Sequence, residues 1–381
     1  MVHDSLLTKL ADILVNYSVL VQPNDLVLLK APLVSRPLVV SLYEAVLNAG
    51  AYPHVEMAPD ECVETLLMCG NEDQLRHEDP FHLHAIEQAD VCITIWSHDY
   101  SPALAMVNPR QQTLMNEGRR RFSDRLSHRA ANGELRWVGT HFPNAVAAQL
   151  ARMSLADYKR FVWQAGFLHY DDPIEIWRNF SQRQQRMIDS LRTVRQLRIT
   201  TPQGTDLTVE VDGRMWINCD GHENFPDGEV FTSPLEDSTQ GAVFFSFPAM
   251  HEGREADGVR LEFKDGRVTD VRAKRGEEFL IAMLDQDPGA RVLGEIALGT
   301  NYAVTQSTRN TLLDEKMGGT FHLGLGAGHP ETGARNVSAT HWDMVCDLRF
   351  GGKILADGQA ISENGRFMNP NWPRTPPTTS C

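Results

Sequence analysis

The sequence predicts two domains of different class: an α/β domain with a parallel sheet, then an α+β domain with an antiparallel sheet. With 381 residues, the chain is longer than one hydrophobic core usually serves. Its first part alternates short apolar runs with helical patterns, whereas hydrophobicity from residue 196 alternates with period two. We therefore expect an α/β domain with a helical connector over residues 1–195, an α+β domain over residues 196–368, and a flexible tail over residues 369–381.

A β–α–β unit begins the predicted parallel domain. Residues 5–20 carry apolar side chains at helical spacing, and the apolar run 26–29 is typical of a strand covered on both faces. A helix over residues 37–49, closed by Gly50, and a strand over residues 52–57 complete the unit. Further strands are expected at 91–96 and 136–139, and further helices at 82–88, 154–164 and 173–195. No glycine-rich phosphate loop follows these strands, so a nucleotide is not implied.

Antiparallel hairpins are predicted for the second part of the chain. Its period-two segments are separated by Asp-Gly turns, such as Asp265-Gly266, which are typical of hairpins. One helix, over residues 277–284, interrupts the strands. The clearest strands lie at 197–200, 207–211 and 260–263.

Composition excludes several kinds of partner. The net charge of −14 disfavours a nucleic-acid surface, because affinity there comes mainly from Lys and Arg, and we interpret Arg119–Arg121 as a solvated helix face. No apolar run approaches the roughly 18 residues of a membrane span, and residues 1–4 do not resemble a signal peptide. Six scattered cysteines without a CxxC pair predict free thiols. We expect a cytoplasmic protein without membrane or nucleic-acid partners.

Histidines and a carboxylate are concentrated between residues 321 and 345. His341 and Asp343 are two residues apart, so on a strand both side chains point to the same face. His322 precedes Gly324, which would share its face and leave room near the backbone. This segment predicts half of a metal site. The charged run Asp314–Lys316 just before it would either support the ligands from behind or form a surface turn, and we favour the turn.

Two upstream carboxylates could supply the other half. Glu229 follows a Pro-Asp-Gly turn and begins an apolar strand, where a carboxylate either stabilises the turn or binds a ligand. Glu295 lies within an apolar run, where it needs a cation or hydrogen-bond donors to compensate its burial. Five candidate ligands exceed what one catalytic zinc uses and suit two metal ions that share a bridging carboxylate and a bridging water. The five are Glu229, Glu295, His322, His341 and Asp343.

Four motifs in order resemble the thermophilic aminopeptidase family. They are NFPDGEVFTSP, LGEIALG, HLGLGAGHPETG and NVSATHWDM, within a likeness that extends over nearly the whole chain. The resemblance implies a homodimeric dinuclear metallo-aminopeptidase that hydrolyses short peptides and uses two divalent ions such as Zn, Co or Mn. When the metal ligands of the family are assigned to the matching motif positions of this sequence, they are the same five residues. Glu229 or Glu295 would shuttle a proton to the leaving amine.

One position departs from the family pattern. His329 stands where the family has a tyrosine that is thought to assist the transition state. It could donate a hydrogen bond in place of the tyrosine, join the metal shell, or favour another reaction. Two alternatives therefore stay open. One is a mononuclear iron dioxygenase, similar to the dihydroxypyridine dioxygenases, that uses His322, His341 and Asp343. The other is a repurposed or inactive homologue.

Overall fold

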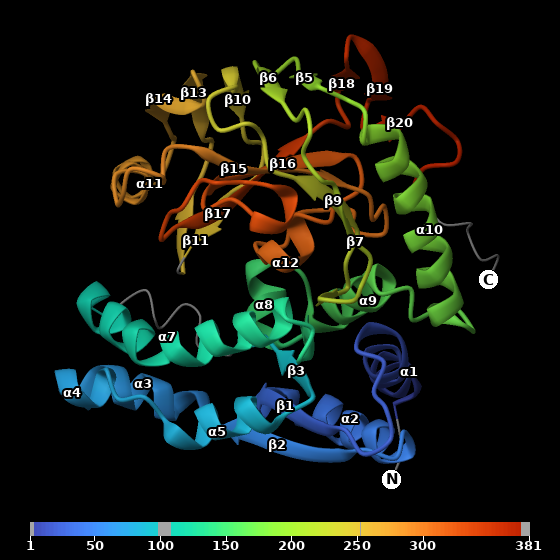
Figure 1. Ribbon diagram of the computed structural model, residues 1–381, viewed down its shortest axis with the longest axis vertical. Coiled ribbons are helices and arrows are strands. Elements are labelled where there is room, and N and C mark those ends of the chain that lie inside the picture. The colour runs from blue at the N-terminus through green and yellow to red at the C-terminus, as the bar shows by residue number, and fades with distance from the viewer. Residues whose placement is uncertain (1–3, 98–107, 252, 375–381) are drawn as a thin grey trace. The chain divides into compact units, whose positions relative to one another are not determined.

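The computed structural model describes residues 4–97, 108–251 and 253–374 (Figure 1). The chain forms two compact units, one of Met1–Ile174 with Gly221–Pro226 and one of Glu175–Asp220 with Asp227–Cys381. Helix α10 (Pro173–Leu191) lies almost wholly in the second unit, whereas the sequence placed it with the first domain.

The first unit contains the predicted parallel sheet. Its five strands have the order β2-β1-β3-β4-β8, and each neighbouring pair is parallel. Val27, Leu28 and Leu29 are all buried, so both faces of β1 are covered, as predicted. The last strand, β8, was not expected, because it comes from a two-residue segment far along the chain. The bounds are β1 Leu26–Pro32, β2 Tyr52–Ala58, β3 Val91–Ile95, β4 Arg136–Thr140 and β8 Asn224–Phe225.

Local signals account for the helices of this unit. Ser154 Oγ accepts a hydrogen bond from Asp157 N at 3.1 Å and caps α9, as predicted. The single helix expected over residues 5–20 is instead α1 followed by a π-helical turn, Leu14–Ser18. The arginines of 119–121 are exposed on α7, as predicted. The bounds are α1 Ser5–Ile13, α2 Arg36–Asn48, α3 Asp60–Cys69, α4 Glu72–Leu75, α5 Pro80–Gln88, α7 Pro109–Ala131, α8 Ala145–Leu150 and α9 Leu155–Ala165, with a 3₁₀ turn at Leu33–Ser35.

The second unit contains antiparallel sheets, as predicted. An eight-stranded sheet has the order β14-β13-β10-β6-β5-β18-β19-β20, and a five-stranded sheet has the order β17-β16-β15-β9-β7. Asp265-Gly266 joins β13 to β14, as expected of a hairpin turn. Helix α11 (Glu277–Leu284) has the predicted bounds. The first sheet comprises β5 Gln196–Thr200, β6 Asp206–Glu210, β10 Gln240–Phe244, β13 Arg260–Lys264, β14 Arg267–Arg272, β18 Lys353–Ala356, β19 Gln359–Glu363 and β20 Arg366–Phe367. The second comprises β7 Ile217–Cys219, β9 Glu229–Thr232, β15 Leu293–Gly299, β16 Thr320–Gly326 and β17 His341–Asp347. The smaller elements are β11 Ala249–His251, β12 Arg254–Ala256, α12 Thr311–Asp314 and a 3₁₀ turn at Pro330–Thr332.

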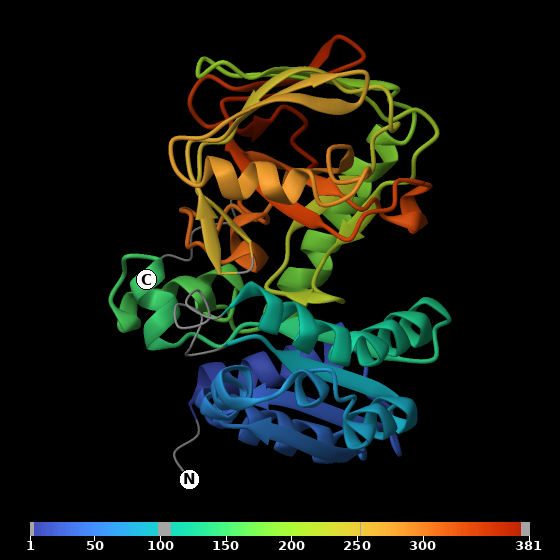
Figure 2. The same cartoon turned by 90° about the vertical axis from the view of Figure 1, so that its left-hand side faces the viewer.

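The main core of the second unit lies between its two large sheets, which Figure 2 shows as stacked layers. Phe321, Leu323 and Leu325 of β16 point into this core together with apolar side chains of the eight-stranded sheet. Because side chains alternate along a strand, His322 and Gly324 point to the opposite face. That second face of the five-stranded sheet carries the polar site.

The remaining sequence-based expectations concern the cysteines, the tail and membranes. The five cysteines within the described ranges are free, and Cys381 lies outside them. Within the tail predicted from residue 369, Trp372 is buried and packs against Phe367, while residues 375–381 lie outside the described part. Among the described residues, no helix is both long and apolar enough for a membrane span.

Candidate metal centre

Strand register brings the predicted ligands onto one face of the five-stranded sheet. Gly324 of β16 lies opposite both Glu295 of β15 and Asp343 of β17. His341 lies opposite Gly326, two residues further along β16, and His322 lies opposite Ala297. Glu229 begins β9, which pairs with the other edge of β15. Residues opposite each other share a face, so four neighbouring strands present these side chains together.

Gly324 provides the space in which the side chains meet. A Cβ atom at this position would lie 2.8 Å from His341 Cε1, 2.9 Å from Asp343 Oδ1 and 2.9 Å from Glu295 Cβ. These distances are shorter than real Cβ contacts. The prediction that a glycine here leaves room beside the backbone is confirmed.

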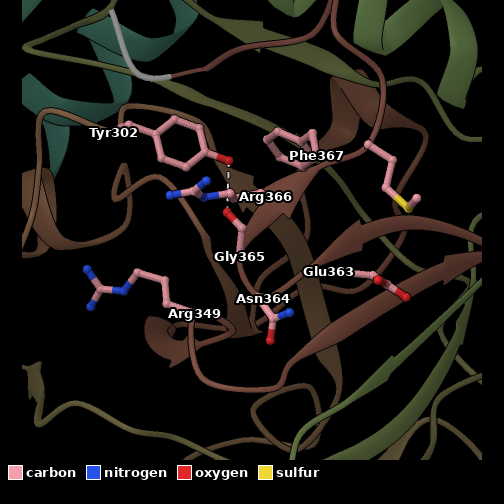
Figure 3. A pocket seen from close by; sticks show the side chains of 8 residues that line it. Tyr302, Arg349, Glu363, Asn364, Gly365, Arg366 and Phe367 are labelled. Atoms are coloured by element: carbon pink, nitrogen blue, oxygen red, sulfur yellow. Dashed lines mark hydrogen bonds between the residues drawn. The ribbon is translucent and has the colours of Figure 1, made fainter. Parts of the chain in front are cut away.

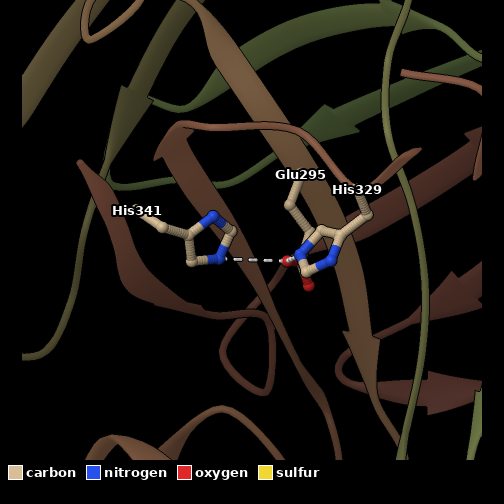
Figure 4. Close-up of side chains that lie close together, drawn as sticks. All are labelled: Glu295, His329 and His341. Carbon is tan, nitrogen blue, oxygen red and sulfur yellow. Dashed lines mark hydrogen bonds and ion pairs between the residues drawn. The ribbon is translucent and has the colours of Figure 1, made fainter. Parts of the chain in front are cut away.

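Glu295 is the centre of the cluster. Its Oε2 lies 2.7 Å from His329 Nε2 and 3.3 Å from His341 Nε2 (Figure 4), and its Oε1 lies 3.2 Å from His322 Nε2. Burial alone would raise the pKa of this carboxyl, but hydrogen bonds from the three histidines hold it well below its ordinary value. Glu295 is therefore ionised and faces three imidazoles. These imidazoles are the donors that compensate the burial of its charge.

A second group of donors lies deeper in the fold. His322 Nε2 lies 3.4 Å from Glu229 Oε2, and the side chains of Glu229, Glu295 and His322 are almost fully buried. Desolvation lowers the pKa of His322, but Glu229 and Glu295 outweigh it and raise the pKa to about 10. Without a metal, the protein would hold a proton between these groups. A metal ion would have to displace that proton.

His341 is oriented by its backbone contact. Its Nδ1 lies 2.9 Å from the Ala327 carbonyl oxygen, so Nδ1–H donates there and Nε2 points at Glu295 and Asp343. Asp343 is the main cause that raises the pKa of His341, to about 12. A backbone carbonyl that fixes the histidine tautomer is a frequent arrangement for metal-binding imidazoles.

His329 lies at the open side of the cluster. It precedes the 3₁₀ turn Pro330–Thr332, and its ring packs against Phe231 with 4.7 Å between centroids. Its Nδ1 lies 3.4 Å from Glu331 Oε1, and its side chain is 32% exposed, whereas that of Glu295 is 5% exposed. The structure thus brings His329 into the same cluster as the five predicted ligands.

The prediction of a surface turn at Asp314–Lys316 is wrong. Lys316 is buried, and its Nζ lies 2.6 Å from Glu229 Oε1, 2.9 Å from Glu315 Oε1 and 3.4 Å from Asp227 Oδ1. Asp314 is buried as well and accepts hydrogen bonds from Ser307 and Thr308. Carboxylates compensate the buried ammonium, so the charges that suggested a solvated turn instead pair with one another inside the fold.

Sequence reasoning missed several residues that support the site. Asp227 was interpreted only as part of a turn, and for Glu315 a surface turn was favoured over a supporting role beside the ligands. Gln184 of α10 donates hydrogen bonds from Nε2 to the carbonyl oxygens of Cys219 and Glu229, which fixes the start of β9. One available signal was the position of the charged run between Leu312-Leu313 and the uncharged segment from Met317 to Phe321.

The donor set fits divalent metal ions. Two triplets have ligand atoms within 4.8 Å of one another and share Glu295: one with His329 and His341, the other with Glu229 and His322. Among the described residues, three buried polar atoms of the cluster make no hydrogen bond: Glu229 Oε2, His322 Nδ1 and Asp343 Oδ1. Leaving buried polar atoms without partners is costly, and borderline divalent ions take such nitrogen and carboxylate ligands.

A surface pocket of about 680 Å³ lies elsewhere in the second unit (Figure 3). Tyr302 and Arg349 line it, but none of the candidate ligands does. Tyr302 donates a hydrogen bond to the Gly365 carbonyl oxygen, and Arg349 pairs with Asp347, so these polar groups are already engaged. The histidine–carboxylate cluster, and not this pocket, therefore remains the candidate site.

Comparison with known proteins identifies the class. The sequence matches the thermophilic metalloprotease (M29) family over residues 3–367. It is 31% identical over 412 residues to Aminopeptidase 2 of Geobacillus stearothermophilus, covering 96% of this chain and 97% of that protein. It is 30% identical to Aminopeptidase AmpS of Bacillus subtilis (strain 168) over 242 residues, covering 55% of this chain and 58% of that protein.

Two solved structures share the fold. Wild-type AmpT from Thermus thermophilus matches with a TM-score of 0.85 at 22% identity, covering 96% of this chain and 99% of that one. The 2,5-dihydroxypyridine dioxygenase from Pseudomonas putida KT2440 matches with a TM-score of 0.61 at 16% identity, covering 96% and 97%. The chain belongs to the thermophilic metalloprotease (M29) family. This confirms the resemblance and the predicted enzyme class, a metallo-aminopeptidase and hence a hydrolase with divalent metal cofactors.

Proposed function

We propose that this protein removes the N-terminal residue of short peptides with two divalent metal ions bound in the histidine–carboxylate cluster. The observation that carries the proposal is the position of Glu295, whose two oxygens face separate groups of candidate ligands. A carboxylate between two groups of ligands is well placed to be shared by two metal ions. Zn, Co or Mn would suit these ligands. Assembly as a homodimer in the cytoplasm is part of the same proposal.

Each of the five candidate ligands has a role in this proposal. Glu295 would bridge the two ions, with Glu229 and His322 on the buried side and His341 and Asp343 on the open side. The ions would polarise the scissile carbonyl and lower the pKa of a bridging water. Glu229 or Glu295 would pass a proton to the leaving amine.

His329 would act on the substrate from the open side. Its contacts with Phe231 and Glu331 hold the ring in place, while its exposure leaves it accessible to a peptide. Nε2 is 2.7 Å from Glu295, so it lies within reach of the reacting centre. We propose that it donates a hydrogen bond there, the role that the resemblance gives to a tyrosine.

A dioxygenase is the second candidate function. It would use His322, His341 and Asp343 around one iron. Among the described residues, these three do not form a group with ligand atoms within 4.8 Å of one another, and the groups that do form include a glutamate. The groups that contain Glu229 or Glu295 support the two-metal proposal over the iron site. The 16% identity to the dioxygenase supports only the fold.

The test compares free and blocked substrates. Purified protein should hydrolyse aminoacyl anilides and short peptides with a free N-terminus, should not cleave their N-acetylated forms, and should lose activity on chelation. Glu295→Gln should abolish hydrolysis, while Glu363→Gln, at a partly exposed residue paired with Lys353, should leave it unchanged. Substrate-dependent oxygen uptake with one iron per chain, or no hydrolysis across a broad panel of metal-loaded assays, would reject the proposal.

A further inference from the structure

Lys316 is a buried cation beside the deeper half of the cluster. Its side chain is 2% exposed, and its Nζ contacts the carboxylates of Asp227, Glu229 and Glu315. In the described part of the chain, its ion pairs involve only these three partners, and none reaches His329, His341 or Asp343. Its positive charge therefore acts on one side of the cluster.

The contact with Glu229 restricts what that carboxylate can offer. Oε1 is held by the Lys316 ammonium at 2.6 Å, while Oε2 faces His322 and makes no hydrogen bond. Glu229 thus presents one oxygen to the Glu229–Glu295–His322 triplet. The ammonium withdraws charge from this ligand and repels a second cation placed next to it.

We propose that Lys316 makes the two metal positions unequal, so that the position Glu295 shares with His341 fills first and the one formed by Glu229, Glu295 and His322 binds its ion weakly. The inference rests on the proposed two-metal site. Without the lysine, Asp227, Glu229 and Glu315 would face one another in a buried space, where only a bound cation would compensate their charge. The Lys316 ammonium compensates part of this carboxylate charge whether or not a metal ion is bound.

The test is a titration of the metal-free full chain with Zn²⁺, followed by calorimetry and by metal counts in buffered free zinc. The wild type should bind in two steps whose dissociation constants differ at least tenfold. Lys316→Met should tighten the second step at least tenfold and change the first step less. Lys316→Arg, which keeps the charge, should retain two unequal steps. Lys30→Met is the matched control, because Lys30 pairs with Glu56 in the first unit and is not one of the residues of the cluster.

Equal affinities in the wild type would overturn the inference, and so would an unchanged or weaker second step in Lys316→Met. If the methionine variant does not fold, Lys316→Gln provides the same comparison, since an amide can still donate a hydrogen bond to Glu229 without a charge. The readout is metal affinity. A protein that binds zinc in two unequal steps but cleaves no peptide would therefore leave this inference standing and reject the proposed peptidase activity.

Discussion

Gly324→Ala is the sharpest mutation for the geometry of the site. Gly324 lies in strand β16 and does not have a positive φ, so alanine can adopt its backbone conformation. The added Cβ would nevertheless lie within 2.9 Å of atoms of His341, Asp343 and Glu295. Ordinary van der Waals contact begins near 3.4 Å, so these groups must each move by about 0.5 Å.

Displacements of this size are large for a catalytic site. A misplacement of roughly 1 Å can cost about 100-fold in rate, so we expect kcat/KM on an aminoacyl anilide to fall about 10- to 100-fold. Bound metal should also decrease, because all three displaced residues are candidate ligands. Overpacking should cost about 1–3 kcal/mol in the free energy of unfolding.

Gly133→Ala separates lost stability from lost geometry. Gly133 has φ +69°, and a methyl group added there would have no other atom within 4 Å, so alanine introduces only backbone strain of about 1–2 kcal/mol. This control should keep full activity and full metal content. The reasoning is refuted if Gly324→Ala retains kcat/KM within threefold of the wild type with both metals bound, or if the control loses activity equally.

Three further predictions concern the shared glutamate, His329 and a buried histidine of the first unit. Glu229→Gln should lose one metal per chain and Glu295→Gln both, as measured by elemental analysis after dialysis; an equal loss in the two variants would contradict a shared Glu295. His329→Leu should lower kcat roughly 100-fold with little change in KM, because leucine has no donor for the reacting centre; an unchanged kcat would remove His329 from the mechanism. Burial lowers the pKa of His141 to about 4, so its contribution to stability is present above pH 6.5 and is lost as the pH falls toward 4. The free energy of unfolding should drop by about 2 kcal/mol more between pH 7 and pH 5 in the wild type than in His141→Gln; parallel pH profiles would show that His141 is not responsible.

Regular patterns in the sequence predicted most of the fold. The bounds of α11, the Ser154 cap and the Asp265-Gly266 hairpin are local features, and local signals were sufficient for them. Strand β8 was missed, because its two residues join the parallel sheet through a distant partner, β4. Pairing between distant segments leaves little trace in a single sequence.

The candidate site was predicted only in part, for a related reason. His341 and Asp343 could be placed on one face because strand periodicity determines it. Lys316 could not be placed, because a run of charged residues is usually solvated and only tertiary contacts bring three carboxylates around its ammonium. His329 lies in a loop without periodicity, so its 2.7 Å approach to Glu295 depends on how that loop folds back.

The metal content of protein purified without chelator tests the central claim most directly. The dinuclear account predicts two divalent ions per chain at saturating metal, hydrolysis of aminoacyl anilides by that form, and recovery of activity when metal is restored to the chelated protein. One iron per chain with substrate-dependent oxygen uptake, or full hydrolysis by metal-free protein, would contradict it.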